Sequence, residues 1–265
     1  MAKRPRQLVV TLAPAALAIV LGVGALASCS TRTAGSGGPA AEPAPSGSPI
    51  VSAGSPTPPS CDRSTLIGTV AVSRVAVRTA PSRSARKLAS FARTNAEGAP
   101  QVFDLLGEVA SAYGDSWYRA LLPLRPNGTT GFLPAGSLRL SQTLYRLDVD
   151  RAHLQLTLWN GCRVAGRYPI GLGTRDTPTP VGTFYLIALV KPPTDGSVYG
   201  AFAYGLSAYS DALTNWTGGG IIGLHGTNDP SSIGKRESHG CIRMLNADIE
   251  HLTKILPLGT PIEID

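Results

Sequence analysis

The sequence carries little charge and has no stripe of basic residues interleaved with aromatic ones. Charged residues make up 15% of its 265 residues, aromatic residues make up 6%, and the formal net charge is +7. Part of this charge belongs to the first residues of the chain and the rest is scattered, whereas a nucleic-acid-binding face gathers Lys and Arg on one surface. The composition argues against nucleic acid as a partner; exposed cations would suit anionic polymers of a cell envelope instead.

Large apolar residues are almost absent from residues 30–63. This segment consists mostly of Pro, Gly, Ser and Ala, a composition that buries too little apolar surface to offset the entropy of folding. We predict a disordered linker here, which acts as a spacer between a membrane and the folded part of the chain.

Residues 1–29 have the layout of an export signal, because three basic residues precede an apolar stretch that ends in small residues. The last four, Leu26-Ala27-Ser28-Cys29, resemble a bacterial lipobox, in which the cysteine is lipidated and becomes the mature N-terminus. We predict an extracytoplasmic lipoprotein, anchored to the cell membrane through Cys29 and facing the cell wall. The alternatives are a retained membrane helix and ordinary cleavage that leaves Cys29 as a thiol.

Residues 64–141 read as short strands separated by turns, as expected of a small all-β barrel. The stretches 77–82, 115–119 and 131–133 resemble bacterial SH3-like domains, and that resemblance implies binding of cell-wall peptides. The alternative is that Trp117 and Phe132 are ordinary core residues.

Residues 142–265 form the second predicted domain, which is also β-rich. Apolar and polar residues alternate on both sides of Asn160-Gly161, which predicts a hairpin with a type I′ turn at these two residues. Further strands are expected at 180–190, 220–226 and 260–265, and a helix at 246–256 with Asn246 as its N-cap. The predicted fold class is mainly β, with one short helix near the C-terminus.

The stretch from residue 225 to residue 245 holds the residues that bear chemistry. Cys241 attacks only as a thiolate, and a free thiol has a pKa of about 8.5, so it needs a base or a positive environment. His239 is two residues away and would share its side of a strand, whereas His225 would need a neighbouring strand to reach Cys241. The spacing leaves both histidines open as the base.

A zinc site is the alternative use of these side chains, joined by His251. Their spacing matches none of the usual zinc patterns, and His251 fits the polar face of the predicted helix. We expect no metal here.

Ser238-His239-Gly240-Cys241-Ile242-Arg243, with His225-Gly226 sixteen positions before the cysteine, resembles the signature of the YkuD family of L,D-transpeptidases. Upstream, residues 177–184 are similar to the family's Thr-Pro-Thr-x-Gly-Thr-Phe segment. The resemblance covers residues 145–265 and implies a β-rich catalytic domain.

The resemblance implies a cysteine-dependent acyltransferase that cross-links peptidoglycan stem peptides. Cys241 would attack the penultimate residue of a tetrapeptide stem and release D-alanine, and an amine of another stem would take the thioester to give a 3→3 link. His225 would be the general base, with its ring oriented by the Gly226 carbonyl. His239 and Gly240 would line the site and help the Cys241 amide to bind the oxyanion. One amide bond is exchanged for another, so neither ATP nor another cofactor is needed.

Arg243 and Ser238 are the candidate substrate-binding residues. Arg243 would hold the stem's carboxylate through paired hydrogen bonds, or would pair with a local acid such as Glu237. Ser238 would alternatively cap or orient the motif loop. Four aromatic residues before the motif form either a lid over the substrate or ordinary packing: Tyr199, Tyr204, Tyr209 and Trp216.

Cys61 and Cys162 remain after Cys29 and Cys241 are assigned, and in an oxidising compartment they are candidate partners in a disulfide. Two rival functions stay open: an L,D-carboxypeptidase, in which water replaces the amine, and a non-catalytic lipoprotein that binds cell wall. The oligomeric state is open as well.

Overall fold

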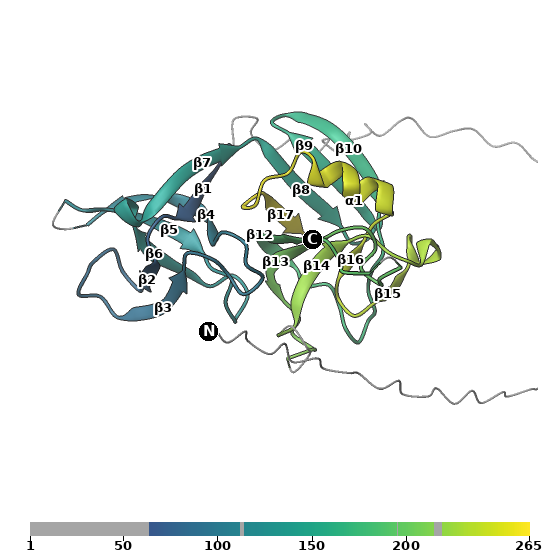
Figure 1. Cartoon of the computed structure of the whole chain (residues 1–265), viewed down its shortest axis with the longest axis horizontal. Coiled ribbons are helices and arrows are strands. Elements are labelled where there is room, and N and C mark those ends of the chain that lie inside the picture. Colours follow the sequence, from purple (N-terminus) through teal and green to yellow (C-terminus); the bar gives the residue numbers. More distant parts are fainter. Residues whose placement is uncertain (1–63, 112–113, 195, 215–218) are drawn as a thin grey trace, which may run out of the picture. The chain divides into compact units, whose positions relative to one another are not determined.

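The computed structural model describes residues 64–111, 114–194, 196–214 and 219–265, and all of them lie in one compact unit, residues 54–265 (Figure 1). Strands make up 50% of the described residues and helices make up 7%. The predicted mainly β class, with one short helix near the C-terminus, is therefore confirmed. The predicted export signal, the linker, Cys29 and Cys61 lie outside the described residues. In the described ranges, no helix has the length and apolar character needed to cross a membrane.

The first sheet is antiparallel and has seven strands in the order β3-β2-β6-β5-β4-β1-β7. Its elements are β1 Thr65–Val70, β2 Arg74–Arg78, β3 Lys87–Ala92, β4 Val102–Ala110, β5 Ser116–Leu121, β6 Thr130–Pro134, the 3-10 turn Ala135–Ser137 and β7 Leu138–Thr143. Successive side chains point to opposite faces of each strand, so alternate residues are buried. In β2, Val75 and Val77 lie in the core and their neighbours do not. Trp117 is a core residue at 1% exposure, and Phe132 is half-buried. Similarity to SH3-like domains stays a prediction.

The second sheet is mixed and has eight strands in the order β10-β9-β8-β17-β12-β13-β14-β16, and β11 and β15 form a separate parallel pair. The elements of this part of the chain are β8 Tyr145–Asp150, β9 Gln155–Asn160, β10 Arg163–Pro169, β11 Leu172–Gly173, β12 Gly182–Val190, β13 Ala203–Tyr209, β14 Ile221–His225, the 3-10 turn Pro230–Ser232, β15 Arg236–Ser238, β16 Ile242–Arg243, α1 Asn246–Thr253 and β17 Pro261–Ile264. Within the eight-stranded sheet, two pairs are parallel, β17 with β8 and β14 with β16.

Helix α1 packs on the second sheet through the face that its periodicity predicts (Figure 1). Ile249 and Leu252 are fully buried and Leu256 is 6% exposed, in one cluster with sheet residues such as Leu158. The helix ends at Thr253 rather than at residue 256, because Leu256 precedes Pro257 and a residue before proline is disfavoured in the helical region.

The hairpin between β9 and β10 forms, but its turn differs from the predicted one. Asn160 pairs with Arg163, so the two turn residues are Gly161 and Cys162, and Gly161 alone of these has a positive φ, 56°. The prediction of a type I′ turn at Asn160-Gly161 is therefore wrong. The register is set by burial: Leu156 and Leu158 must face the core, and a shift by one residue would expose both.

Cys162 at this turn is disulfide-bonded, and its partner lies outside the described residues. Because Cys61 also lies outside them, the Cys61–Cys162 pairing stays a prediction.

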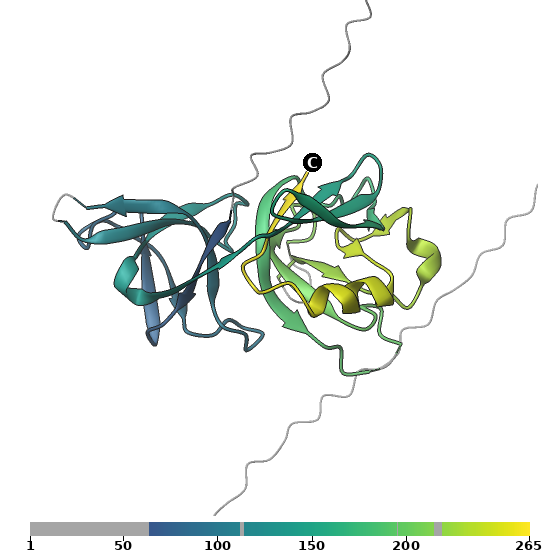
Figure 2. The ribbon, with the colours of Figure 1, turned by 90° about the horizontal axis from the view of Figure 1, so that it is seen from above.

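The chain passes from the first sheet to the second through β7 and β8 (Figure 2), and the sheets share an apolar cluster. Ile67, Val102 and Leu121 of the first sheet pack with Tyr185 and Ile187 of β12. The burial of this cluster holds the two sheets together.

Polar contacts also join the two sheets. The Asn127 side chain accepts a hydrogen bond from Tyr209 N (2.9 Å) and donates one to Tyr209 O (2.8 Å). Arg125 donates to Ser210 O (2.7 Å) and Gly219 O (3.1 Å), with its guanidinium over the Tyr209 ring. These bonds fix the loop that follows β13 against the first sheet.

Asp104 is a buried carboxyl in β4, near this junction. It is 6% exposed, and burial raises its pKa from 3.8 to about 6. Burial also raises the pKa of Tyr185, and the Asp104 charge adds to that rise. The folded protein thus binds the Asp104 proton more tightly than the unfolded chain does, so this group lowers stability as the pH rises from about 4 to about 6.

We predict that this effect is on the order of 3 kcal/mol, because one pH unit corresponds to about 1.36 kcal/mol. Urea unfolding measured from about pH 4 to about pH 7 should show this effect as a fall in the stability of wild type relative to Asp104→Asn. The comparison is needed because buried His225, whose pKa is lowered to about 4 in the folded protein, raises the stability of both proteins over the same pH range. The control is Asp115→Asn, whose carboxylate is exposed beside Arg83. Parallel curves for wild type and Asp104→Asn would contradict the burial of a titrating carboxyl.

Candidate active site

The parallel pairing of β14 with β16 brings the two halves of the sequence motif together. Leu224 pairs with Ile242 and His225 with Arg243, so Gly223 lies opposite Cys241. The Gly223 N–H donates a hydrogen bond to Cys241 Sγ at 3.3 Å. Residues eighteen positions apart in the sequence thus become neighbours through adjacent strands.

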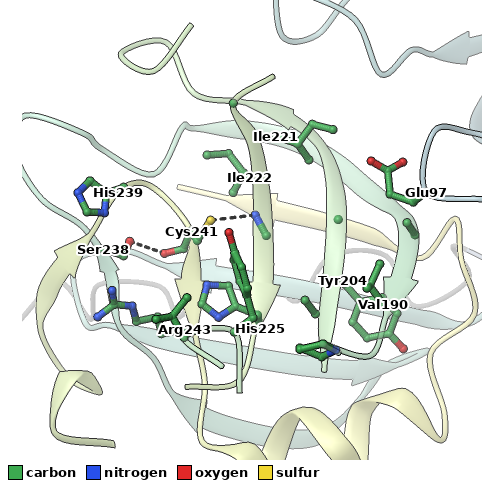
Figure 3. Close-up of a pocket in the computed structure, with 18 of the residues that line it drawn as sticks. Glu97, Val190, Tyr204, Ile221, Ile222, His225, Ser238, His239, Cys241 and Arg243 are labelled. Carbon is green, nitrogen blue, oxygen red and sulfur yellow. Dashed lines mark hydrogen bonds between the residues drawn. The ribbon is translucent and has the colours of Figure 1, made fainter. Parts of the chain in front are cut away.

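His225 is the histidine that lies beside the thiol. A Cβ placed on Gly223 would be 3.4 Å from Cδ2 of the His225 ring and 3.7 Å from Cys241 Sγ, so both side chains flank the Gly223 backbone (Figure 3). His239 is exposed and lies at the rim of the same cavity. The structure therefore favours His225 over His239, which the spacing left open.

The His225 ring is fixed in one tautomer. Its Nδ1 lies 2.5 Å from the Gly226 carbonyl oxygen, and since a carbonyl only accepts, Nδ1 carries the proton. Nε2 then has a free lone pair. Burial is the largest cause that lowers the pKa of His225 to about 4. The hydrogen bond to Gly226 opposes this shift, and the charge of Arg243 adds to it. The imidazole is neutral at neutral pH.

The thiol is also neutral at rest. Burial raises the pKa of Cys241 above its usual value of 9.0, and the Gly223 N–H and the Arg243 charge only partly oppose this. Cys241 and His225 therefore rest as a neutral thiol and a neutral imidazole rather than as a thiolate–imidazolium pair.

The loop that carries Cys241 is held by Ser238. Its hydroxyl donates to Cys241 O (2.6 Å) and accepts from Gly240 N (3.1 Å), and the residue is 2% exposed. Gly240 has a φ of +112°, which L-residues rarely adopt, and a Cβ there would lie 3.1 Å from Ile222 Cδ1. Ser238 therefore orients the loop, and the Gly240 N–H is used in the hydrogen bond to Ser238 within that loop.

The Thr-Pro-Thr segment, residues 177–179, and Thr174 before it hold the same loop through hydrogen bonds. Ser238 O accepts hydrogen bonds from Thr174 N (3.0 Å) and Thr177 Oγ1 (3.2 Å). Thr179 Oγ1 accepts one from Gly173 N at 3.0 Å. This segment gives the loop a rigid base.

Asn246 is a positioning residue that the sequence interpretation placed elsewhere. Leu245 occupies the N-cap position of α1 without a side-chain bond, so Asn246 is not the cap. Its Oδ1 instead accepts from Ala201 N (3.1 Å), in the segment before β13, and from Thr227 N (3.0 Å), in the loop after β14. A Cβ on Gly226 would lie 2.2 Å from this oxygen, so the contact requires glycine there.

A cavity of about 470 Å³ opens over Cys241 and His225. Arg243 lines it, and Glu237 pairs with Lys235 at 3.8 Å; no ion pair joins Arg243 to an acid in the part of the chain that the structure describes. Arg243 is thus placed to meet a bound anion.

The four aromatic residues before the motif separate into different roles. Tyr199 is 45% exposed, lines the cavity, and meets the His225 ring edge-on with centroids 5.1 Å apart. Tyr204 is a core residue whose hydroxyl donates to Leu256 O, and Tyr209 bonds at the junction between the sheets. Trp216 lies outside the described residues. Ordinary packing thus fits Tyr204 and Tyr209, but Tyr199 belongs to the site.

Within the described ranges, no three His, Cys, Asp or Glu side chains are grouped as metal ligands. His251 is exposed on α1, away from the cavity lining.

The sequence comparisons agree on one family. The model of the L,D-transpeptidase catalytic domain, YkuD, matches residues 144–264. YkuD of Bacillus licheniformis is 36% identical over 153 residues, which cover 55% of this chain and 85% of that protein. YkuD of Bacillus subtilis is 40% identical over 121 residues, 46% of this chain and 66% of that protein. The chain belongs to the YkuD family of L,D-transpeptidases.

Solved structures with detectable similarity include Bd1075 of Bdellovibrio bacteriovorus, 31% identical with a TM-score of 0.37 over 46% of this chain and 47% of that one. An L,D-transpeptidase from Mycobacterium smegmatis is 17% identical, with a TM-score of 0.37 over 57% of this chain and 90% of that one. The L,D-transpeptidase domain of the present chain, as the family model matches it, runs from β8 to β17. Its family indicates an enzyme of the transferase type.

We predict that Asn246→Ala destabilises this L,D-transpeptidase domain by roughly 1 to 2 kcal/mol, because the backbone N–H of buried Thr227 loses its acceptor, whereas the Ala201 N–H, whose bond to Asn246 is exposed, can bind water instead. Urea unfolding would measure the loss. Asn160→Ala, at an exposed hairpin position, is the matched control. Equal, small losses in the two variants would show that Asn246 does not hold the loop.

Proposed function

We propose that this protein is a peptidoglycan L,D-transpeptidase that forms 3→3 cross-links through a thioester on Cys241. The observation that carries the proposal is the His225 ring, held by the Gly226 carbonyl with its basic nitrogen unprotonated and beside the thiol. A buried, oriented base next to a cysteine is the arrangement that nucleophilic catalysis needs.

In the first step, Cys241 Sγ attacks the carbonyl carbon of the third stem residue while His225 Nε2 takes the thiol proton. The tetrahedral intermediate collapses when the same nitrogen returns that proton to the departing nitrogen of D-alanine. The products are D-alanine and a thioester. His225 thus acts first as base and then as acid.

In the second step, the side-chain amine of another stem attacks the thioester and gives a proton to His225 Nε2. The sulfur leaves and regains a proton from the imidazolium, so the enzyme returns to its neutral pair. One amide bond has been exchanged for another, and no cofactor enters. If water attacks instead, the same thioester yields the carboxypeptidase product.

The neutral resting pair matters for the electrostatics of these steps. Charge separates only as the reaction proceeds, and fixed donors around the sulfur and the oxyanion act most strongly in a site with little water. Arg243 and the Gly223 N–H are placed to stabilise negative charge on the sulfur, since both lower the Cys241 pKa. We assign Arg243 the further role of binding a carboxylate of the stem.

The site of action in this proposal is outside the membrane. The basic and apolar layout of residues 1–29 and the lipobox at Cys29 support an exported, lipid-anchored protein whose linker reaches the cell wall.

We expect the full chain to convert a disaccharide tetrapeptide into a cross-linked dimer with release of D-alanine. Cys241→Ala should abolish both, because the nucleophile is gone, and intact-mass and product analysis would show it. Tripeptide without dimer would assign the protein as a carboxypeptidase. Unchanged substrate with wild type would favour the non-catalytic cell-wall-binding alternative.

We also predict the pH dependence of D-alanine release. The base must be neutral, so kcat/KM should fall only as the pH drops through about 4, the pKa of buried His225, rather than through 6.5. The measurement is a rate profile, with far-UV circular dichroism to confirm folding at each pH. A midpoint near 6.5 would mean that the ring is hydrated in the working enzyme.

A further inference from the structure

The catalytic cavity extends from Cys241 to a residue of the first sheet. Glu97, in the loop between β3 and β4, lines the same cavity as His225, Cys241 and Arg243. Figure 3 shows the Glu97 carboxylate on the opposite side of the cavity from Arg243. The cavity therefore has a cationic end beside the nucleophile and an anionic end at the first sheet.

The turn that carries Glu97 is built and anchored. Asn95 N donates to Ala99 O (2.9 Å), Ala99 N donates to Asn95 Oδ1 (3.0 Å), and Gly98 N donates to Asn95 O (3.1 Å). The Asn95 side chain also donates to Ile187 O of β12 at 2.9 Å. This last bond ties the turn to the sheet that carries the catalytic residues and sets the position of Glu97 over the cavity.

Glu97 is the only carboxylate among the residues that line the cavity, and no ion pair involves it in the described part of the chain. Arg125, a cation at the same junction, directs its guanidinium at the carbonyls of Ser210 and Gly219. The charge of Glu97 reaches the junction, since it raises the pKa of Tyr209. The carboxylate is exposed and open to a ligand.

We infer that Glu97 is a specificity-determining residue that binds an ammonium group of the donor stem peptide. The inference rests on the proposed function and names a subsite of the same cavity. A carboxylate attracts a cation and favours the protonated form of an amine. It would hold a spectator ammonium and would not activate an attacking amine, which must be neutral. The occupant is therefore the free side-chain amine of the donor stem while its carbonyl lies at Cys241.

The arrangement of charges supports this choice of ligand. A donor stem carries carboxylate and ammonium groups on one chain, and the cavity offers Arg243 and Glu97 on opposite sides. The rest of the cavity lining is mostly apolar and includes Ile187, Val190 and Val198. A few polar groups on an apolar lining orient a ligand and give specificity.

The test compares two tetrapeptide donors, one with a free side-chain amine and one in which that amine is acetylated. Single-turnover release of D-alanine is measured against donor concentration in full-length wild type, Glu97→Gln and Glu250→Gln. Glu250 is an exposed acid on α1 and controls for the loss of one charge. Release of D-alanine precedes the acceptor step, so acetylation reports on the donor alone.

We expect Glu97→Gln to raise the half-saturating concentration of the free-amine donor about fivefold, with an unchanged maximal rate, because an exposed charge pair is screened by water. Wild type should bind the acetylated donor about fivefold more weakly, and Glu97→Gln should no longer discriminate between the donors. Wild-type discrimination should also weaken at high salt. If Glu97→Gln keeps the wild-type preference, the inference is overturned while the proposed function stands.

Binding measured without turnover distinguishes failure of the ammonium subsite from failure of the proposed reaction. Calorimetric titration of both donors into Cys241→Ala and into Cys241→Ala/Glu97→Gln should show the same preference, lost only in the double variant. If wild type releases no D-alanine but this binding preference is present, the proposed reaction fails and the ammonium subsite stands. Equal binding of the two donors to Cys241→Ala overturns the subsite.

Discussion

The parallel pairing of β14 with β16 at the edge of the second sheet is the constraint on which the site depends. It places Gly223 against Cys241, and it puts His225 and Arg243 at one register position. Strand pairing fixes backbones to within a hydrogen-bond length, so the thiol and the imidazole need no flexible segment to meet. Ser238 and Asn246 then hold the loops at the two ends of this pairing.

Burial gives this pair its chemical character. The same removal from water raises the pKa of the Cys241 thiol and lowers that of the His225 imidazole, so both groups rest uncharged. A neutral pair resists oxidation and metal capture better than a standing thiolate, since the thiolate is the reactive form. In the proposed reaction, charge must therefore separate during the attack, which makes the groups that stabilise negative charge on the sulfur, the Gly223 N–H and Arg243, important.

The first sheet contributes to the catalytic cavity as well as to its own core. Asn95 bonds to β12, and Asn127 and Arg125 bond to the loop after β13, which forms part of the cavity wall. An apolar cluster shared by the two sheets fixes these contacts in place. The first sheet thus meets the cavity through packed and hydrogen-bonded contacts.

The sequence by itself determined the mainly β class, the strand that ends at His225, the buried face of α1 and the family, because side-chain periodicity and motif spacing are local properties. The spacing left open whether His225 or His239 serves Cys241, although the family resemblance implied His225. The sequence interpretation also misplaced the hairpin turn by one residue and assigned Asn246 to a cap. Only the tertiary structure decided these, since each depends on strand order and register, which are set by burial across the whole sheet. The raised and lowered pKa values, and the presence of Glu97 in the cavity, likewise come from which distant segments the fold brings together and removes from water.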